Sequence, residues 1–224
     1  MTMRFRSAVL CAAMVALAGC AVPGANRPDA SPEEVAAARY RHDGPPAITL
    51  YTMVNNRSDA GAHSSLMINA PSQRVVFDPA GSVRAKNVPE VGDVLYGITP
   101  DVAEFYGRAH ARETYRVRIQ RIEVPAEVAE RALQLAQASG PVAEAQCTVA
   151  TSGLLKQLPG FEGISSTWFP VRLADQLAKY PGVTEQVLRE NDADDKQIAI
   201  AEYEARITAA GPGGRNRSGD QDSQ

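Results

Sequence analysis

The chain has 224 residues, a formal net charge of -3 at pH 7 and a charged fraction of 22%. Its length and its apolar content of 44% suffice for one domain with a full core. The sequence has no basic stripe and no aromatic residues interleaved with Lys and Arg, which are the usual footprint of a protein that binds nucleic-acid phosphates. We therefore expect no nucleic-acid partner.

Residues 1–19 are typical of a secretory signal peptide, with two early arginines and an apolar run that is too short to span a membrane comfortably. The run ends in Leu17-Ala18-Gly19-Cys20, which resembles the lipobox of bacterial lipoproteins. This resemblance implies cleavage before Cys20 and acylation of that cysteine. The lipid would anchor the mature protein in the cell envelope, and Ala21 favours the outer membrane, facing the periplasm. An ordinary signal peptide with an incidental cysteine is the alternative.

The segment 20–31 is rich in Pro, Gly, Asn and Asp, which is the composition of a tether. A single domain is expected over 32–210. Its first helix begins at Ser31-Pro32-Glu33-Glu34, where Ser31 is a good N-cap and proline fits the first turn. Residues 211–224 have the composition of a disordered tail.

Three strands are predicted over 47–54, 63–68 and 74–78, because their apolar residues are separated by turn-rich segments. Their short spacing indicates an antiparallel meander. Asp78-Pro79-Ala80-Gly81 is a turn signal that ends the third strand.

The middle of the chain contains weaker signals. A short strand is predicted over 93–98, and a helix runs from Thr99-Pro100 to about Tyr106. Tyr115–Val124 alternates between apolar and polar residues but changes phase, which predicts a strand with a bulge or bend.

Helices dominate the last part of the domain. Helical periodicity predicts helices over 125–138, from about Cys147 to Leu158, and over 171–180. A short helical piece is expected over 184–190, whereas 196–209 fits a helix or a strand equally well.

Cys147 holds the one thiol outside the N-terminal segment. It lies in the opening turn of a predicted helix, where unpaired N–H groups and the helix dipole stabilise a thiolate. Thr151, Leu154 and Leu158 share its face, so the thiol should point inward. A cysteine that serves only as a small buried apolar residue is the alternative.

A thiol nucleophile needs a base and a group that orients the base. His42 and His110 are expected in exposed polar connections. His63 instead begins an apolar strand, and the following hairpin brings Asp78 back to its level. Asp78 could therefore accept from the imidazole, and an equally good interpretation is that it caps the turn before Pro79.

The order of GAHSSLMI, VVFDPAG and QCTVATSGLL resembles the circularly permuted papain-like hydrolases and acyltransferases, which include NlpC-type and lecithin retinol acyltransferase-like proteins. The resemblance implies an α+β fold in which an antiparallel sheet packs against helices, one of them bearing Cys147. It also implies Cys147 as nucleophile, His63 as base and Asp78 as the orienting residue. Family members more often have His, Asn or Glu at this last position.

The resulting expectation is a thiol hydrolase or acyl-transfer enzyme that acts on an amide or ester, either in peptidoglycan peptide or in a lipid. The Cys147 backbone N–H would help to stabilise the oxyanion. No motif for a metal or cofactor is found. The pair Trp168-Phe169 could wall a substrate cleft, although core or interface is the more ordinary place for such residues. A non-catalytic lipoprotein that binds or assembles in the envelope is the alternative function.

Overall fold

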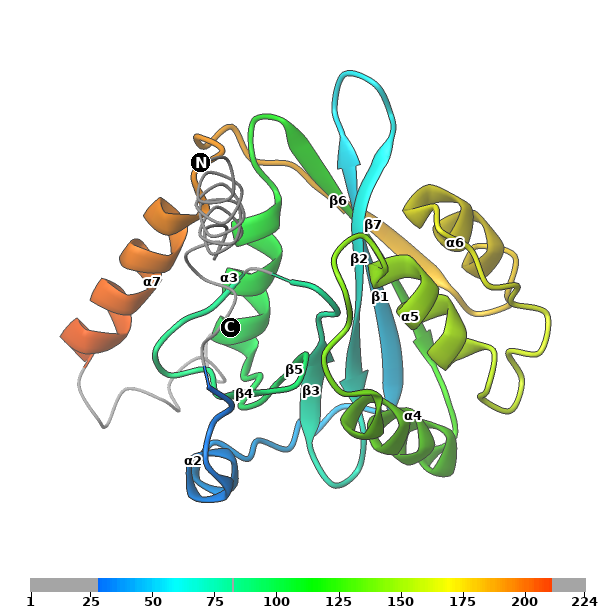
Figure 1. Cartoon of the computed structure of the whole chain (residues 1–224), viewed down its shortest axis with the longest axis horizontal. Coiled ribbons are helices and arrows are strands. Elements are labelled where there is room, and N and C mark those ends of the chain that lie inside the picture. The colour runs from blue at the N-terminus through cyan, green and yellow to red at the C-terminus, as the bar shows by residue number, and fades with distance from the viewer. Residues whose placement is uncertain (1–27, 82, 211–224) are drawn as a thin grey trace, which may run out of the picture.

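The computed structural model describes residues 28–81 and 83–210. The predicted signal peptide, Cys20 and the C-terminal tail lie outside these residues. The fold is α+β, with a seven-stranded antiparallel sheet covered by helices on both faces (Figure 1). The α+β class and the packing of an antiparallel sheet against helices are thereby confirmed.

The strand order across the sheet is β4-β5-β3-β2-β1-β6-β7. The strands are β1 (Ala47–Asn55), β2 (Gly61–Asn69), β3 (Arg74–Phe77), β4 (Glu90–Val91), β5 (Val94–Leu95), β6 (Tyr115–Glu123) and β7 (Thr184–Leu188). The helices are α2 (Pro32–Ala37), α3 (Pro100–His110), α4 (Ala126–Ser139), α5 (Cys147–Leu155), α6 (Pro170–Leu177) and α7 (Lys196–Ala210).

The predicted meander of β1, β2 and β3 is confirmed, with β1 in the interior of the sheet between β2 and β6. Eight of the nine residues of β1 are buried, because helices cover both of its faces. The first helix, α2, is also as predicted at its start: Ser31 and Glu34 form a reciprocal capping box. It ends at Ala37, well before Gly44.

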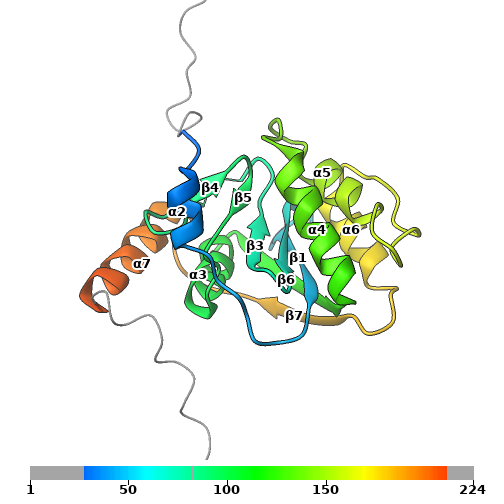
Figure 2. The ribbon, with the colours of Figure 1, turned by 90° about the horizontal axis from the view of Figure 1, so that it is seen from below.

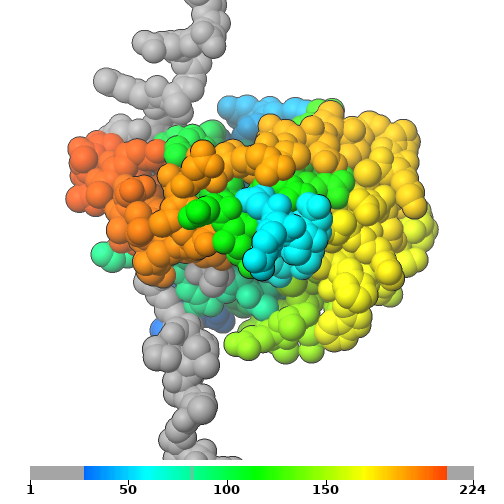
Figure 3. Space-filling view, turned by 90° about the horizontal axis from the view of Figure 1, so that it is seen from above, coloured from blue at the N-terminus to red at the C-terminus, as the bar shows by residue number. Residues whose placement is uncertain are grey.

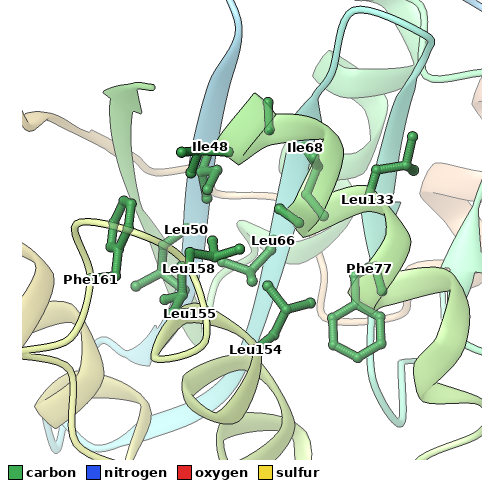
Figure 4. Packing of buried hydrophobic residues seen from close by; sticks show 14 of the residues in the cluster. Ile48, Leu50, Leu66, Ile68, Phe77, Leu133, Leu154, Leu155, Leu158 and Phe161 are labelled. Atoms are coloured by element: carbon green, nitrogen blue, oxygen red, sulfur yellow. The ribbon is translucent and has the colours of Figure 1, made fainter. Parts of the chain in front are cut away.

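Each face of the sheet has its own apolar core. Helices α4, α5 and α6 cover one face, and α3 and α7 cover the other (Figures 1 and 2). The first core joins alternate residues of β1 and β2 to α4 and α5, as Figure 4 shows for Ile48, Leu50, Leu66, Ile68, Leu133, Leu154 and Leu155. The second core joins the opposite faces of the same strands, through Tyr51 and Met53, to α3 and α7. A side chain on β2 therefore reaches either the α5 side or the α3 side, according to its position.

Two predicted features differ in the structure, and one irregularity was not predicted. Thr184–Leu188 is the edge strand β7 and not a helical piece, since it pairs with β6 over its whole length. The bulge predicted in Tyr115–Val124 was wrong, because β6 pairs with β1 in an unbroken register. The irregularity lies in β2, where Ala62 is the extra residue between His63, opposite Met53, and Gly61, opposite Val54.

Other boundaries move by a few residues. The short strand expected over 93–98 is the tight β4–β5 hairpin, and the helix predicted to end at Tyr106 continues as α3 to His110. The segment 196–209 is a helix, α7. Within the described ranges, no helix is long and apolar enough to cross a membrane.

Candidate active site

The candidate site lies along the edge of β2 at the point where β3 ends. β3 pairs with β2 only from Leu66 to Asn69, so within residues 28–81 and 83–210 no strand pairs with the preceding part of β2 on this side. The first turn of α5 approaches this open edge from one face, and the last turns of α3 lie on the other. Residues from both helices therefore meet across the edge of a single strand.

His63 is on the α3 side of the sheet, because it lies opposite Met53, whose side chain belongs to the core beneath α3. Its ring stacks on that of His110, with the ring centroids 5.9 Å apart. The His63 Nε2 atom lies 2.7 Å from Oδ1 of Asp78, directly after β3. The predicted pairing of His63 with Asp78 is therefore present in the geometry.

Asp78 is 3% exposed, and its carboxylate accepts a second hydrogen bond. The Tyr106 hydroxyl lies 2.7 Å from Oδ1 of Asp78 and 2.7 Å from the Ser65 hydroxyl. Since an ionised carboxylate can only accept, Tyr106 donates to Asp78 and accepts from Ser65. Asp78 also makes a turn, because its carbonyl accepts from the Gly81 N–H at 2.8 Å. The carboxylate therefore faces the imidazole ring, whereas the bond of the turn comes from the main chain of Asp78 and not from its side chain.

Cys147 is the first residue of α5 and is 7% exposed. Its sulfur interacts with the His63 ring and accepts a hydrogen bond from the backbone N–H of Ser64, on the open edge of β2. Because Asp78 occupies Nε2 of His63, Nδ1 is the ring nitrogen left for the thiol. The structure therefore brings Cys147, His63 and Asp78 together in one line of contacts.

A buried hydroxyl cluster fixes α5 on β2. The Ser64 hydroxyl lies 3.1 Å from Oγ1 of Thr148 and 2.9 Å from Oγ1 of Thr151. Thr151 also donates to the Cys147 carbonyl at 3.0 Å. All three hydroxyl residues are at most 1% exposed, so these bonds are shielded from water and hold the first turn of the helix in a defined place.

The charges of the site favour an imidazolium–thiolate pair. Burial lowers the pKa of His63, but its hydrogen bonds and charge interactions with Asp78 and Cys147 outweigh burial and raise that pKa to about 9. Burial raises the pKa of Cys147, whereas the interaction with His63, together with Thr148 and the Ser64 N–H, lowers it to about 7. Between these two values the thiolate and the imidazolium coexist.

Asp78 stays ionised throughout this range. Burial raises its pKa, but the hydrogen bond and charge of His63, followed by the charge of His110 and the bond from Tyr106, lower the pKa to about 2. The carboxylate therefore offers a permanent negative charge that holds the proton on His63.

The start of α5 also offers donors for an oxyanion. Gln146, at the N-cap, makes no side-chain capping bond to the N–H groups of the first turn. Its own side chain is exposed to solvent. The preceding Ala145 has a φ of 64°, a left-handed conformation that turns the chain sharply into the helix. The Cys147 N–H belongs to this first turn and is therefore a candidate donor for an oxyanion.

No protein-family model, no curated protein and no solved structure matches this chain.

The structure corrects the interpretation of His110. It was expected in an exposed polar connection, but it is 3% exposed in the last turn of α3. Its Nδ1 donates to the Tyr106 carbonyl at 2.9 Å, and burial, with the charge of Lys196, lowers its pKa to about 3. His110 is therefore neutral beside the charged His63. The helix was predicted to end at Tyr106. If it had been extended by one turn, Tyr106 and His110 would have been predicted on one face of it.

His42 lies away from the candidate site, and Trp168 and Phe169 are not in the core. His42 is half-buried in the loop before β1, where its Nδ1 accepts from the Gly44 N–H, and Gly44 contacts Asn69 at the far end of β2. Trp168 and Phe169 are each 60% exposed, so they are not core residues. The next residue, Pro170, approaches Gly61 so closely that no side chain would fit there. The aromatic pair therefore comes directly before a residue that packs on the beginning of β2, and Figure 3 shows the tip of the β1–β2 hairpin (cyan) beside this yellow part of the chain.

Donor atoms of His63, Asp78 and His110 lie within 4.8 Å of one another, which is close enough to share a metal ion. The local charges do not favour that use. Lys196 places a positive charge beside both Asp78 and His110, and Nε2 of His63 already contacts the carboxylate. The geometry fits a hydrogen-bonded chain from Tyr106 through Asp78 to His63 better than it fits a cation site.

Proposed function

We propose that this protein is a thiol hydrolase or acyl-transfer enzyme with a permuted papain-like fold. The observation that carries the proposal is the buried alignment of Cys147, His63 and Asp78, in which a carboxylate holds an imidazole against a thiol at a helix N-terminus. This alignment supplies a nucleophile, a proton carrier and an orienting charge.

The reaction would begin when the Cys147 thiolate attacks the carbonyl carbon of an amide or ester. The electron pair of the carbonyl moves to its oxygen, where the Cys147 N–H stabilises it. As the tetrahedral intermediate collapses, the bond to the leaving group breaks, and that group takes the proton of His63. A thioester on Cys147 remains. His63, now neutral, takes a proton from water or from an acceptor alcohol or amine, which attacks the thioester and restores the thiol pair.

We further propose that a lipid on Cys20 anchors the protein in the cell envelope of a bacterium, at the outer membrane and facing the periplasm. Peptidoglycan peptide is the substrate that this location favours first, and a lipid ester or amide is the second. Replacement of Cys20 by Ser should release the protein from the membrane fraction and abolish its labelling by a fatty acid.

A test of the chemistry uses the domain from Ala30 onward and a small activated ester such as p-nitrophenyl acetate. Intact-mass measurement should show one acetyl group on the wild type and none on the Cys147→Ala variant. Mapping of the adduct to any other residue, or a wild type that is not acylated, would contradict the proposal.

One observation favours a non-catalytic alternative. The thiol is only 7% exposed, and two surface hollows of about 420 and 450 Å³ lie elsewhere, one between α4 and α5 and the other between α3 and β7. In that alternative the buried polar line stabilises a lipoprotein that binds a partner in the envelope. The acylation experiment separates the two functions.

A further inference from the structure

A buried carboxylate outside the proposed triad connects the segments that carry two of its members. Asp93 lies in the two-residue turn of the β4–β5 hairpin and is 8% exposed. Its Oδ2 accepts from the Ala80 N–H at 3.0 Å and from the Val142 N–H at 2.8 Å. Its main-chain carbonyl accepts from the Asp78 N–H at 2.8 Å. One residue therefore fixes both the turn after β3 and the loop before α5.

The two segments held by Asp93, the 78–81 turn and the 140–146 loop, have different roles in the proposed site. The 78–81 turn presents the carboxylate that holds His63. The 140–146 loop delivers Cys147, and it contains two residues with a positive φ, Gly140 at its start and Ala145 just before its last residue. The hairpin turn also packs closely on this loop, since a side chain at Gly92 would meet the Gly140 backbone at 3.4 Å. A change at Asp93 would consequently move the Asp78 turn and the Cys147 loop relative to each other.

The chemistry of Asp93 is unusual for a purely structural residue. No ion-pair partner for it is found in the described part of the chain, and its bonds there come from backbone N–H groups. Burying a carboxylate without a cation is unfavourable unless its oxygens are well satisfied. A carboxylate suits this place because one of its oxygens accepts from both loops, and it carries no donor that would face an N–H group.

We propose that Asp93 is a positioning residue that sets the separation of the Cys147 sulfur from the His63 ring and thereby the extent to which the thiol is ionised. This role rests on the proposed function, because it concerns the same thiol pair. Asp93 touches neither the thiol nor a substrate and acts through the two loops that it holds.

The test measures the rate of Cys147 alkylation by iodoacetamide from pH 5 to pH 10 in the chain from Ala21 onward, which keeps the bond from the Gly92 N–H to Asp29 and has Cys147 as its one cysteine. Asp93→Ala removes the acceptor and Asp93→Ser leaves only a shorter one, whereas Asp93→Asn keeps one oxygen that can accept from both N–H groups. We expect Asp93→Ala and Asp93→Ser to fold and to show a Cys147 titration displaced to higher pH by roughly half to one unit, and Asp93→Asn to keep the wild-type titration. Because a less acidic thiolate is also more nucleophilic, alkylation at pH 6 should fall about two- to threefold in the first two variants.

Two control variants separate positioning from general effects. Glu130→Gln alters a comparable clamp, since the Glu130 carboxylate accepts from the Ser72 N–H and hydroxyl at the far end of the sheet. Glu90→Gln removes a nearby carboxyl group that titrates within the measured pH range, since burial raises its pKa to about 7. Both controls should leave the Cys147 titration where it is in the wild type.

The outcomes are distinguishable. A Cys147 titration that is unchanged in folded Asp93→Ala and Asp93→Ser would overturn the positioning role while leaving the proposed function intact. Loss of the fold in both Asp93→Ala and Asp93→Ser would make Asp93 structural and would also overturn it. A wild-type Cys147 that titrates as an ordinary thiol and is not acylated by the activated ester would instead refute the proposed function itself.

Discussion

Replacement of His63 by Ala should lower the rate of Cys147 alkylation at neutral pH and raise it at high pH. In the wild type the His63 ring is the main cause that lowers the pKa of Cys147, from an ordinary value of 9.0 to about 7, against the effect of burial. Without the ring, burial remains, and the Ser64 N–H and the Thr148 hydroxyl oppose it only in part. The thiol pKa should therefore return to its ordinary value or above.

Two effects set the size of the change. At pH 7 about half of the wild-type thiol is ionised, against roughly 1% in His63→Ala, which is a difference of about fiftyfold. A thiolate whose pKa is higher by about two units is, however, roughly eightfold more nucleophilic. The expected net result is alkylation about sixfold slower at pH 7, about equal near pH 8 and roughly eightfold faster at pH 10.

The measurement is the second-order rate constant with iodoacetamide over this pH range. His42→Ala is the matched control, because that ring lies in a loop near the far end of β2 and should leave the curve unchanged. The reasoning would be refuted if the curves of the wild type and His63→Ala were parallel, or if His42→Ala produced the same crossing.

Further predictions concern stability, measured by chemical denaturation. The pKa of folded His63 is raised to about 9, so its stabilisation is full below about pH 6.5 and is lost as the pH rises through 9. The pKa of folded His110 is lowered to about 3, so stability is also lost as the pH falls from about 6.5 towards 3. The free energy of unfolding should therefore be highest near pH 6.5 and lower at both more acidic and more alkaline pH. Tyr106→Phe removes a donor from the buried Asp78 carboxylate and should cost about 1–3 kcal/mol. Ser64→Ala breaks the hydroxyl cluster beneath α5 and should cost about 1–2 kcal/mol; an unchanged midpoint in either variant would contradict its assigned contact.

Elements with strong local signals could be predicted from the sequence. The meander was predictable because β1, β2 and β3 are apolar runs bounded by turn residues, and the start of α5 because a helical period follows Cys147. The edge strand β7 was misread because most of its residues are exposed and polar, so it lacks the apolar alternation that identifies a strand. Its pairing comes from β6, which a local pattern does not reveal.

Residues that act through tertiary contacts were the ones missed. Nothing local marks Ser64 or Thr151 as partners, since their hydroxyls meet across 87 residues of chain. Asp93 was seen only as the start of a weak strand. His110 looked exposed because its neighbours in sequence are polar or small, whereas the sheet buries it. In each case the missing information was which surfaces pack together.

The position of the site follows from a single interruption of the sheet. The register pairs Leu66 with Phe77, so a longer β3 would place Pro79 opposite Ser64. Proline has no N–H group and cannot continue such a ladder. Because β3 ends before Pro79, the edge of β2 at Ser64 is left without a strand, and the Ser64 N–H donates to the Cys147 sulfur instead. In the same register Asp78 falls opposite Ser65, on the face of the sheet that also carries His63. The Asp-Pro pair after β3 therefore explains why an open strand edge, an orienting carboxylate and a helix-borne thiol occur at one place.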